Sequence, residues 1–198
     1  MERKLEPAVG RRRFIVAAVA TPLILASEGS APKKVFAATP SCGNDLTPPQ
    51  TAGPFFKPRS PRRITLIDPG MQGDKFSVVG RVLTTSCQPV SEALIDFWHC
   101  DANGQYDNRG YRFRGHQFCD DEGRFSLETM LPGIYPGRTR HIHVIVQAAN
   151  HRPLTTQLYF PGEALNERDW IFDPRLLMET AFAGGQRKGT FDFVLDLG

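Results

Sequence analysis

The sequence contains no Cys-x-x-Cys pair, no internal repeat and no low-complexity tract. Without cysteines at that spacing, the chain offers neither a zinc ribbon nor a thioredoxin-type redox site. An oxidising compartment would permit disulfides among the isolated cysteines that it does have. Three pairings are then possible, and the sequence does not choose between them. These cysteines are Cys42, Cys87, Cys100 and Cys119.

A hydrophobic run long enough to span a membrane is also missing. The apolar stretch at residues 14–26 is short for a bilayer and is interrupted by Pro22. It follows three consecutive arginines at 11–13 and precedes a small-residue sequence at 35–38, which is the order found in a twin-arginine-type signal peptide. We therefore predict a signal peptide at 1–37, export to the periplasm or the extracellular space, and no stable membrane anchor.

Little excess charge remains once that segment is removed. Cleavage after Ala37 leaves 17 Lys and Arg against 18 Asp and Glu, so the formal charge of +3 belongs to the signal peptide. A nearly neutral mature chain gives no support for nucleic-acid binding. The remaining 161 residues, 38–198, suit one catalytic domain with a core large enough to fold unaided.

Helical periodicity is scarce, and strand signals take its place. The clearest alternation is near the C-terminus, with Phe191, Phe193, Leu195 and Leu197 on one face. Short strands separated by Gly/Pro-rich turns predict an all-β fold, an antiparallel β-sandwich with long loops and little helix beyond a turn near 166–170. The predicted strands are 76–83, 93–100, 124–130, 141–148, 155–160 and 190–197.

The most informative motif is the His-x-His pair of His141 and His143. Residues two apart in a strand point to the same side, so both imidazoles can bind one ion. Tyr135 lies just upstream in a Pro/Gly-rich turn, and Tyr106 follows an Asn-Gly turn, where functional residues often gather. On these residues alone, a hydrogen-bonded or surface histidine pair is the alternative.

Residues 93–160 resemble the core of the intradiol ring-cleavage dioxygenases, the non-haem iron(III) enzymes that include protocatechuate 3,4-dioxygenase and catechol 1,2-dioxygenase. Four segments match in the family's order and carry two tyrosines, an arginine, two histidines and a glutamine. Residues 51–56 resemble the family's N-terminal Thr-Glu-Gly-Pro pattern, with Ala52 where the family often has glutamate. The four segments are 95–106, 113–125, 131–143 and 154–160.

By this resemblance, the metal ligands are Tyr106, Tyr135, His141 and His143, which hold a non-haem Fe(3+) with water or hydroxide as a fifth ligand. Tyr135 and His143 are implied to be axial, and Tyr106 and His141 equatorial. The donor types suit this ion, because ferric iron favours anionic oxygen and a bound cation deprotonates a phenol whose free pKa is about 10.

The resemblance also implies the partners and the reaction. A catechol-type substrate displaces the axial Tyr135, and O2 then opens the ring between the two hydroxylated carbons to give a cis,cis-muconate-type product. Arg138 is implied to stabilise anionic character on the substrate, and Gln157 to make a second polar contact. The predicted catalytic residues are thus Arg138, Gln157 and Tyr135, whereas the neighbouring Arg140 has no counterpart in the motif.

Two other classes of function stay open. One is a catalytically inactive exported β-sandwich that binds an aromatic or glycan ligand. The other is a copper or zinc site at His141 and His143 in an exported hydrolase, although paired tyrosine ligands are unusual for zinc. Lignin-derived catechols, hydroxyquinol, protocatechuate and chlorinated catechols are all open as substrates, and the sequence leaves the oligomeric state unknown.

Overall fold

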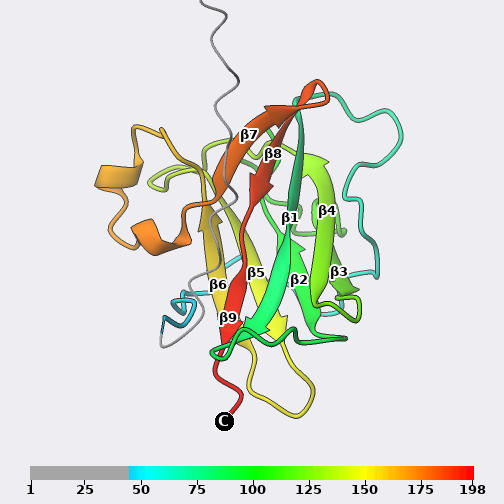
Figure 1. Cartoon of the computed structure of the whole chain (residues 1–198). Helices are drawn as coiled ribbons and strands as arrows, with labels where there is room; N and C mark the ends of the chain where they lie inside the picture. The colour runs from blue at the N-terminus through cyan, green and yellow to red at the C-terminus, as the bar shows by residue number, and fades with distance from the viewer. Residues whose placement is uncertain (1–44) are drawn as a thin grey trace, which may run out of the picture. The chain divides into compact units, whose positions relative to one another are not determined.

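The computed structural model describes residues 45–198, so the predicted signal peptide at 1–37 lies outside the described residues. The described part of the chain folds into nine strands in two sheets, which form the two layers of a sandwich (Figure 1). The strands are β1 (Lys75–Thr84), β2 (Leu94–Trp98), β3 (Arg114–Phe118), β4 (Arg124–Met130), β5 (His141–Gln147), β6 (Leu154–Tyr159), β7 (Glu179–Ala183), β8 (Gln186–Thr190) and β9 (Phe193–Leu195).

The two sheets differ in the number and the relative direction of their strands. The four-stranded sheet has the order β3-β2-β5-β6 and is antiparallel throughout. The other sheet has the order β4-β1-β8-β7, with β9 also paired to β1, and its β1–β8 and β1–β9 pairs are parallel. The predicted all-β sandwich with little helix is confirmed, and the two parallel pairs are a feature that the sequence pattern did not indicate.

All six predicted strands are present; β4 has the predicted ends, and the others differ at one or both ends. The stretch predicted at 190–197 is divided, because Thr190 closes β8 while β9 holds only three residues. The alternating residues of this stretch do pack into or against the core, as predicted. A 3₁₀ turn, η1 (Asn166–Arg168), confirms the predicted helical turn, and a second one, η2 (Pro174–Leu176), follows it.

Alternation along the four-stranded sheet decides which side chains reach the sandwich core. In β2, Ile95 and Phe97 are fully buried in that core, and in β5 the core residues are Ile142, Val144 and Val146. The intervening residues of each strand point the opposite way. The His-x-His pair therefore lies on the outer face of the four-stranded sheet, away from the space between the layers.

A segment without a helix or a long strand of its own, residues 51–63, crosses that outer face. We call it the crossing segment. It touches the four strands one after another, in the order in which they lie in the sheet, and so covers the level at which His143 is found. Its contacts join Thr51 to Gln157 in β6, Gly53 to His143 in β5, Phe56 to Trp98 in β2, and Arg63 to His116 in β3.

The cysteines divide into two kinds. Cys87 is disulfide-bonded, whereas Cys100 and Cys119 are free thiols in buried positions. Burial raises the pKa of the Cys100 thiol to about 11 and that of Cys119 to about 12, so both stay protonated at neutral pH. Cys42 lies outside the described residues.

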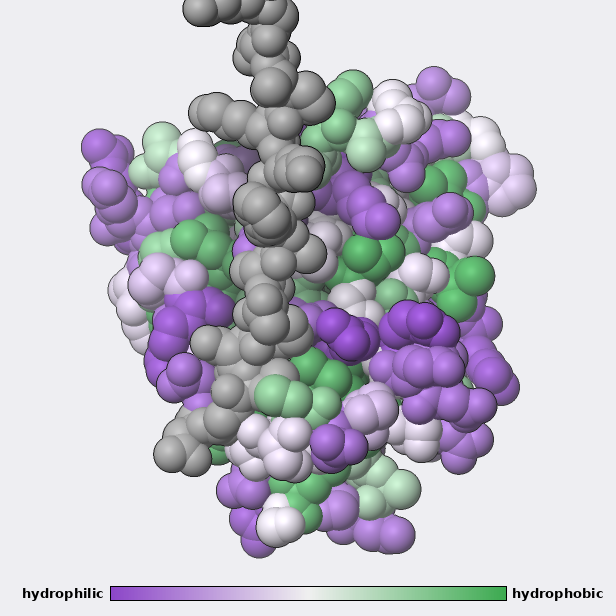
Figure 2. All heavy atoms as spheres, in the orientation of Figure 1, coloured by the Kyte–Doolittle hydropathy of each residue, from purple (hydrophilic) through white to green (hydrophobic). Residues whose placement is uncertain are grey.

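The surface carries scattered apolar side chains. Among them Trp170 is 84% exposed and Phe182 is 77% exposed. Figure 2 shows hydrophobic residues interspersed with hydrophilic ones on the face that it presents. Within residues 45–198, no helix has the length and apolar character needed to cross a membrane.

Candidate metal centre

One row of side chains across the four-stranded sheet forms the floor of the site. Cross-strand register places Arg114 opposite Trp98, Trp98 opposite His143, and His143 opposite Gln157. Directly paired residues in a sheet point to the same side. All four side chains therefore share the outer face beneath the crossing segment, where each residue is between 0% and 3% exposed.

The two predicted histidine ligands present the same ring nitrogen to one point. Nδ1 of His141 is 2.7 Å from the backbone oxygen of Thr139, which can only accept, so this nitrogen carries the proton and Nε2 keeps its lone pair. Nε2 of His141 lies 3.1 Å from Nε2 of His143 and 3.3 Å from the hydroxyl oxygen of Tyr106. Atoms bound at right angles to one first-row metal ion, at about 2.0–2.2 Å, are about 3 Å apart, so these spacings suit a shared ion.

The imidazoles are held in the neutral form that a metal requires. Burial lowers the pKa of His141 to about 4 and places that of His143 well below its ordinary value. The Trp98 indole stacks on the His143 ring, with centroids 4.8 Å apart and planes only 3° from parallel. Stacking against a fully packed indole fixes the plane of His143, so its lone pair has a defined direction.

The two tyrosines come from loops that contact each other backbone to backbone. Tyr106 follows β2 and Tyr135 follows β4, and the N–H of Gly133 donates to the oxygen of Asp101 at 2.8 Å. A Cβ at Gly133 would collide with the backbone of the other loop, so only glycine allows this approach. The result is a pair of phenol rings with centroids 5.8 Å apart.

Tyr106 and Tyr135 have different surroundings. Burial raises the pKa of the Tyr106 hydroxyl well above its ordinary value, so it stays a phenol until a cation binds. Phe55 of the crossing segment stacks on Tyr106 at 4.5 Å and meets the edge of Tyr135 at 5.3 Å. Tyr135 is half-buried, and its hydroxyl makes no hydrogen bond within residues 45–198. The structure thus brings Tyr106, His141 and His143 together and places the Tyr135 ring beside Tyr106.

The donor types of the site and the surroundings of Arg114 suit iron. No group of three His, Cys, Asp or Glu side chains suited to a metal occurs in the described part of the chain, so the candidate set is the mixed one of two histidines and two tyrosines. Nη1 and Nη2 of Arg114 are buried without hydrogen-bond partners, and the guanidinium lies 6.0 Å from the centre of the Tyr106 ring. A buried cation needs a nearby negative charge. The Asp107 and Asp96 carboxylates already act on the Arg114 charge, and a metal-bound Tyr106 phenolate would place a further negative charge beside it, so these residues fit a ferric ion.

Gly53 keeps the space beside His143 open. Its φ of +67° lies in the left-handed region, and a Cβ there would be 3.4 Å from Cε1 and 3.8 Å from Nε2 of His143. A side chain would therefore be strained in the backbone and would stand next to the His143 nitrogen that faces His141. The crossing segment keeps this approach despite alanine at position 52, since the Gln157 amide donates to the Thr51 oxygen at 3.0 Å.

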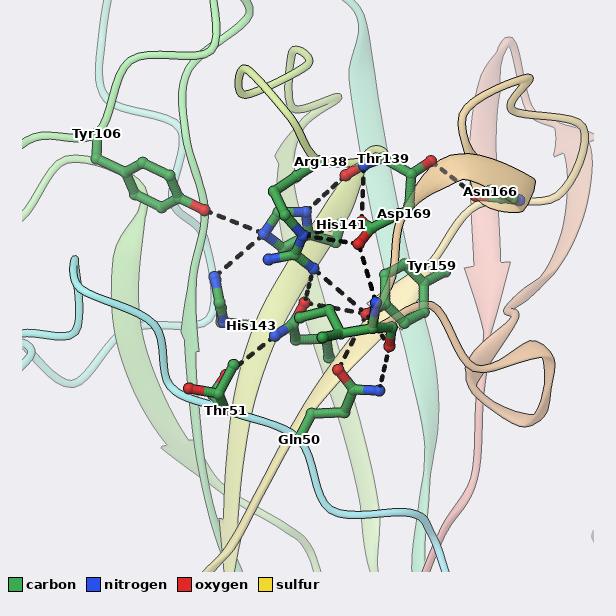
Figure 3. A network of polar contacts seen from close by, with 12 residues as sticks. Gln50, Thr51, Tyr106, Arg138, Thr139, His141, His143, Tyr159, Asn166 and Asp169 are labelled. Atoms are coloured by element: carbon green, nitrogen blue, oxygen red, sulfur yellow. Dashed lines mark hydrogen bonds and ion pairs between the residues drawn. The ribbon is translucent and has the colours of Figure 1, made fainter.

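The Arg138 guanidinium is hydrogen-bonded through two of its nitrogens, and the third, Nη1, has no hydrogen bond to the described residues. Its Nε donates to Asp169 at 2.9 and 3.1 Å (Figure 3). Its Nη2 donates to the Gln157 side-chain oxygen at 2.7 Å. Nη1 makes no hydrogen bond to the described residues and is not enclosed. Arg138 contributes to the low pKa values of His141 and His143, after burial itself. A guanidinium beside the imidazoles with a free N–H can donate to an anionic oxygen there.

Gln157 and Arg140 have structural partners of their own. The fully buried Gln157 amide is committed at both ends, to Arg138 and to Thr51, so it orients the arginine. Arg140 pairs with Glu163 at 2.7 Å and donates to the oxygen of Pro132. Its guanidinium therefore braces the turn that carries Tyr135.

Several residues of the site were not singled out from the sequence. Trp98, Gly53 and Phe55 stand within stretches that resemble the family, so the resemblance contained their signal without assigning them a role. Asp169 had no signal, because it lies 31 residues after Arg138 in a segment with no motif. The roles of Tyr106, Tyr135, His141 and His143 as ligands, and of Arg138 and Gln157 in catalysis, stay predictions.

A family model described as "Dioxygenase" matches residues 51–196, which is most of the chain and contains every predicted site residue. The chain belongs to the dioxygenase family. The family resemblance seen in the sequence is thereby confirmed.

Relatives of this dioxygenase-family chain include hydroxyquinol 1,2-dioxygenase of Nocardioides simplex, which is 30% identical over 152 residues, covering 65% of this chain and 52% of the relative. Among solved structures, the dioxygenase domain of a dioxygenase carbohydrate-binding protein fusion from the cellulolytic bacterium Streptomyces sp. SirexAA-E has a TM-score of 0.76 and 52% identity, covering 78% of this chain and 100% of that one. 3-Chlorocatechol 1,2-dioxygenase of Rhodococcus opacus 1CP has a TM-score of 0.70 and 27% identity, covering 76% and 72%. This member of the family spans about half the length of the curated relatives that it matches.

Proposed function

We propose that the protein is an intradiol dioxygenase that opens a catechol-type ring between its two hydroxylated carbons with O2. The observation that carries the proposal is that two polar atoms lie close to His141 Nε2, namely His143 Nε2 at 3.1 Å and Tyr106 Oη at 3.3 Å. Buried neutral imidazoles and a phenol at that spacing have no evident use in packing, since burying polar groups costs free energy. They suit an Fe(3+) ion, with Tyr135 as the fourth protein ligand.

When bound, Fe(3+) would supply a Lewis-acidic centre that a catecholate can chelate, and it would prepare the catecholate ring for reaction with O2. Tyr135 would hold the ion least firmly of the four, because its half-buried hydroxyl has no hydrogen bond within the described residues. Its phenolate oxygen would be the acceptor for a proton from the incoming catechol hydroxyl. Tyr106, stacked against Phe55, stays in place.

Arg138 acts on the substrate rather than on protons. Its free Nη1 donates to the substrate oxygen on which negative charge grows, while its Nε and Nη2 stay bound to the protein. The Trp98–His143 stack and Gly53 define the wall and the free space beside this oxygen. Relatives named for hydroxyquinol and 3-chlorocatechol make these two ring classes the first substrates to assay.

Colour tests the proposal at once. Protein prepared with iron is expected to hold one Fe(3+) per chain and to show a broad visible band, because phenolate ligands transfer charge to ferric iron. Tyr135→Phe is expected to keep iron more weakly, to shift that band and to turn over at least about 100-fold more slowly, since it loses a ligand and a proton acceptor. Metal analysis, the visible spectrum and oxygen uptake with catechols measure this.

A colourless protein that binds zinc instead would reject the proposal. So would Tyr135→Phe with the wild-type spectrum and turnover. Tyr111→Phe is the matched control, because the Tyr111 hydroxyl donates to the backbone oxygen of Pro58 at 3.0 Å and not to a histidine. This variant is expected to leave colour and rate unchanged.

We further propose that the protein is exported as a folded, iron-loaded chain by a twin-arginine-type signal at 1–37. The disulfide at Cys87 supports an oxidising destination, since such bonds are rare in reducing compartments. Replacing Arg11 and Arg12 by lysine is expected to leave precursor in the cytoplasm, because arginine pairs are read by more than their charge.

The same exchange at Arg12 and Arg13 is the parallel variant, because the triplet allows two pairings. Western blots of cell fractions and the N-terminal sequence of the external protein measure export. External protein with an intact N-terminus, or undiminished export of the variant with all three arginines replaced, would reject the signal.

A further inference from the structure

Three consecutive residues just before His141 are each held by a residue from one short segment after β6. The partners stand three positions apart, in reverse order to the residues that they hold. We call this segment, residues 163–169, the clamp. The contacts are Arg138 with Asp169 at 2.9 and 3.1 Å, Thr139 with Asn166 at 2.7 Å, and Arg140 with Glu163 at 2.7 Å.

The spacing of the clamp follows from its local structure. It contains η1 (Asn166–Arg168), and the N–H of Asn166 donates to the oxygen of Glu163 at 3.1 Å, an i to i+3 bond. A 3₁₀ turn has about three residues per turn, so side chains three apart lie on one face. Glu163, Asn166 and Asp169 therefore reach the same segment, residues 138–140, which leads into β5.

Asp169 makes the most contacts of the three. Besides Arg138, its carboxylate accepts from the N–H of Thr139 at 2.9 Å and of Ile171 at 3.3 Å. Its side chain is 1% exposed, and that of Arg138 is 15% exposed. A carboxylate this enclosed is stable only with its cation, and the cation in turn loses its counter-ion if the carboxylate goes. Figure 3 shows Asp169 between the Arg138 guanidinium and Thr139.

We propose that Asp169 is the positioning residue for Arg138, holding the guanidinium so that its free Nη1 faces the oxygen of a bound catecholate. The inference rests on the proposed function, in which Arg138 acts on that oxygen. Asp169 also offsets much of the arginine's charge. Stabilisation of the substrate then depends on the direction of the Nη1–H bond of Arg138. That direction is fixed because Nε of Arg138 contacts both carboxylate oxygens of Asp169.

Asp169→Asn is the test variant, because the amide keeps an acceptor for the Thr139 N–H and loses the charge that orients Arg138. It is expected to retain one iron per chain and the wild-type visible band, and to lower kcat about 10-fold or more. Its dissociation constant for catechol without O2 is expected to change less than about 3-fold, because iron chelation dominates binding. Glu163→Gln, the same exchange at the other end of the clamp, is expected to keep kcat within about 3-fold.

A double-mutant cycle shows whether Asp169 acts through Arg138. In an Arg138→Ala background, Asp169→Asn is expected to cost less than about 3-fold further in kcat, because the group that it positions is gone. Full, multiplicative losses in both backgrounds would overturn the inference, as would wild-type kcat in Asp169→Asn. Loss of iron from Asp169→Asn would also overturn it, since the residue would then support the metal ligands.

Failure of the proposed function looks different. It appears in the wild-type protein, as absent iron or absent turnover, or in an Arg138→Ala variant of normal rate. The same cycle measured by denaturant unfolding needs neither iron nor substrate. It is expected to show that removing Asp169 or Arg138 destabilises the fold non-additively, and additive losses would overturn the inference in that case too.

Discussion

Replacing His141 or His143 with alanine is expected to remove most of the bound iron. In the proposed site each imidazole supplies one of four protein donors, and even residues behind metal ligands cost about 10- to 100-fold in metal affinity when changed. A loss of more than about 100-fold is therefore expected for either ligand. The visible band should disappear together with the metal, and metal analysis after gel filtration with a spectrum of the same sample measures both.

His151→Ala is the matched control for these variants. His151 is exposed, and its ring contacts only backbone oxygens, those of Ala149 at 2.7 Å and Leu197 at 3.1 Å. It is expected to keep its iron and colour. Circular dichroism of the iron-free proteins separates loss of a ligand from loss of the fold, which matters for His143 because Trp98 stacks on it. Stoichiometric iron in either ligand variant would exclude that histidine from the site.

The sequence predicted the strands that bury an apolar face. β1, β2 and β5 carry β-branched and aromatic residues into the core, and each was found to within a few residues. β7 was missed because all five of its residues are exposed, which leaves no alternation to detect. β8 was missed for the same kind of reason, since its sequence, QRKGT, is polar and buries only Gly189. Such strands are formed by pairing with a neighbour, which a local pattern does not record.

The residues of the candidate site also differ in whether a local sequence pattern reveals them. His141 and His143 have a local signature, because a period of two in a strand can be read from adjacent residues. Tyr106 and Tyr135 needed the family resemblance, since nothing local joins two loops that meet through Gly104 and Gly133. Asp169 needed the structure, because its contact with Arg138 depends on how the chain returns after β6.

Arg138→Ala is expected to lower kcat by about 100-fold while leaving iron content and colour unchanged. That is the usual cost of losing one preorganised donor to a developing anion. Arg138 is not among the proposed metal ligands, and its hydrogen bonds within the described residues run to Asp169, Gln157 and Tyr159. Steady-state oxygen uptake beside metal analysis measures the separation of rate from iron.

Arg140→Ala separates the two arginines, which are close in sequence and differ in partners. Its removal frees Glu163 and the oxygen of Pro132, so a lower melting temperature is expected with kcat within about 10-fold of wild type. Arg138→Lys sharpens the test further. Lysine keeps the charge but cannot bind Asp169 and Gln157 and still offer a third donor, so it is expected to be nearly as slow as alanine. Wild-type rates in Arg138→Lys would mean that charge alone suffices. A larger loss of kcat from Arg140→Ala than from Arg138→Ala would show that Arg140, and not Arg138, is the catalytic arginine.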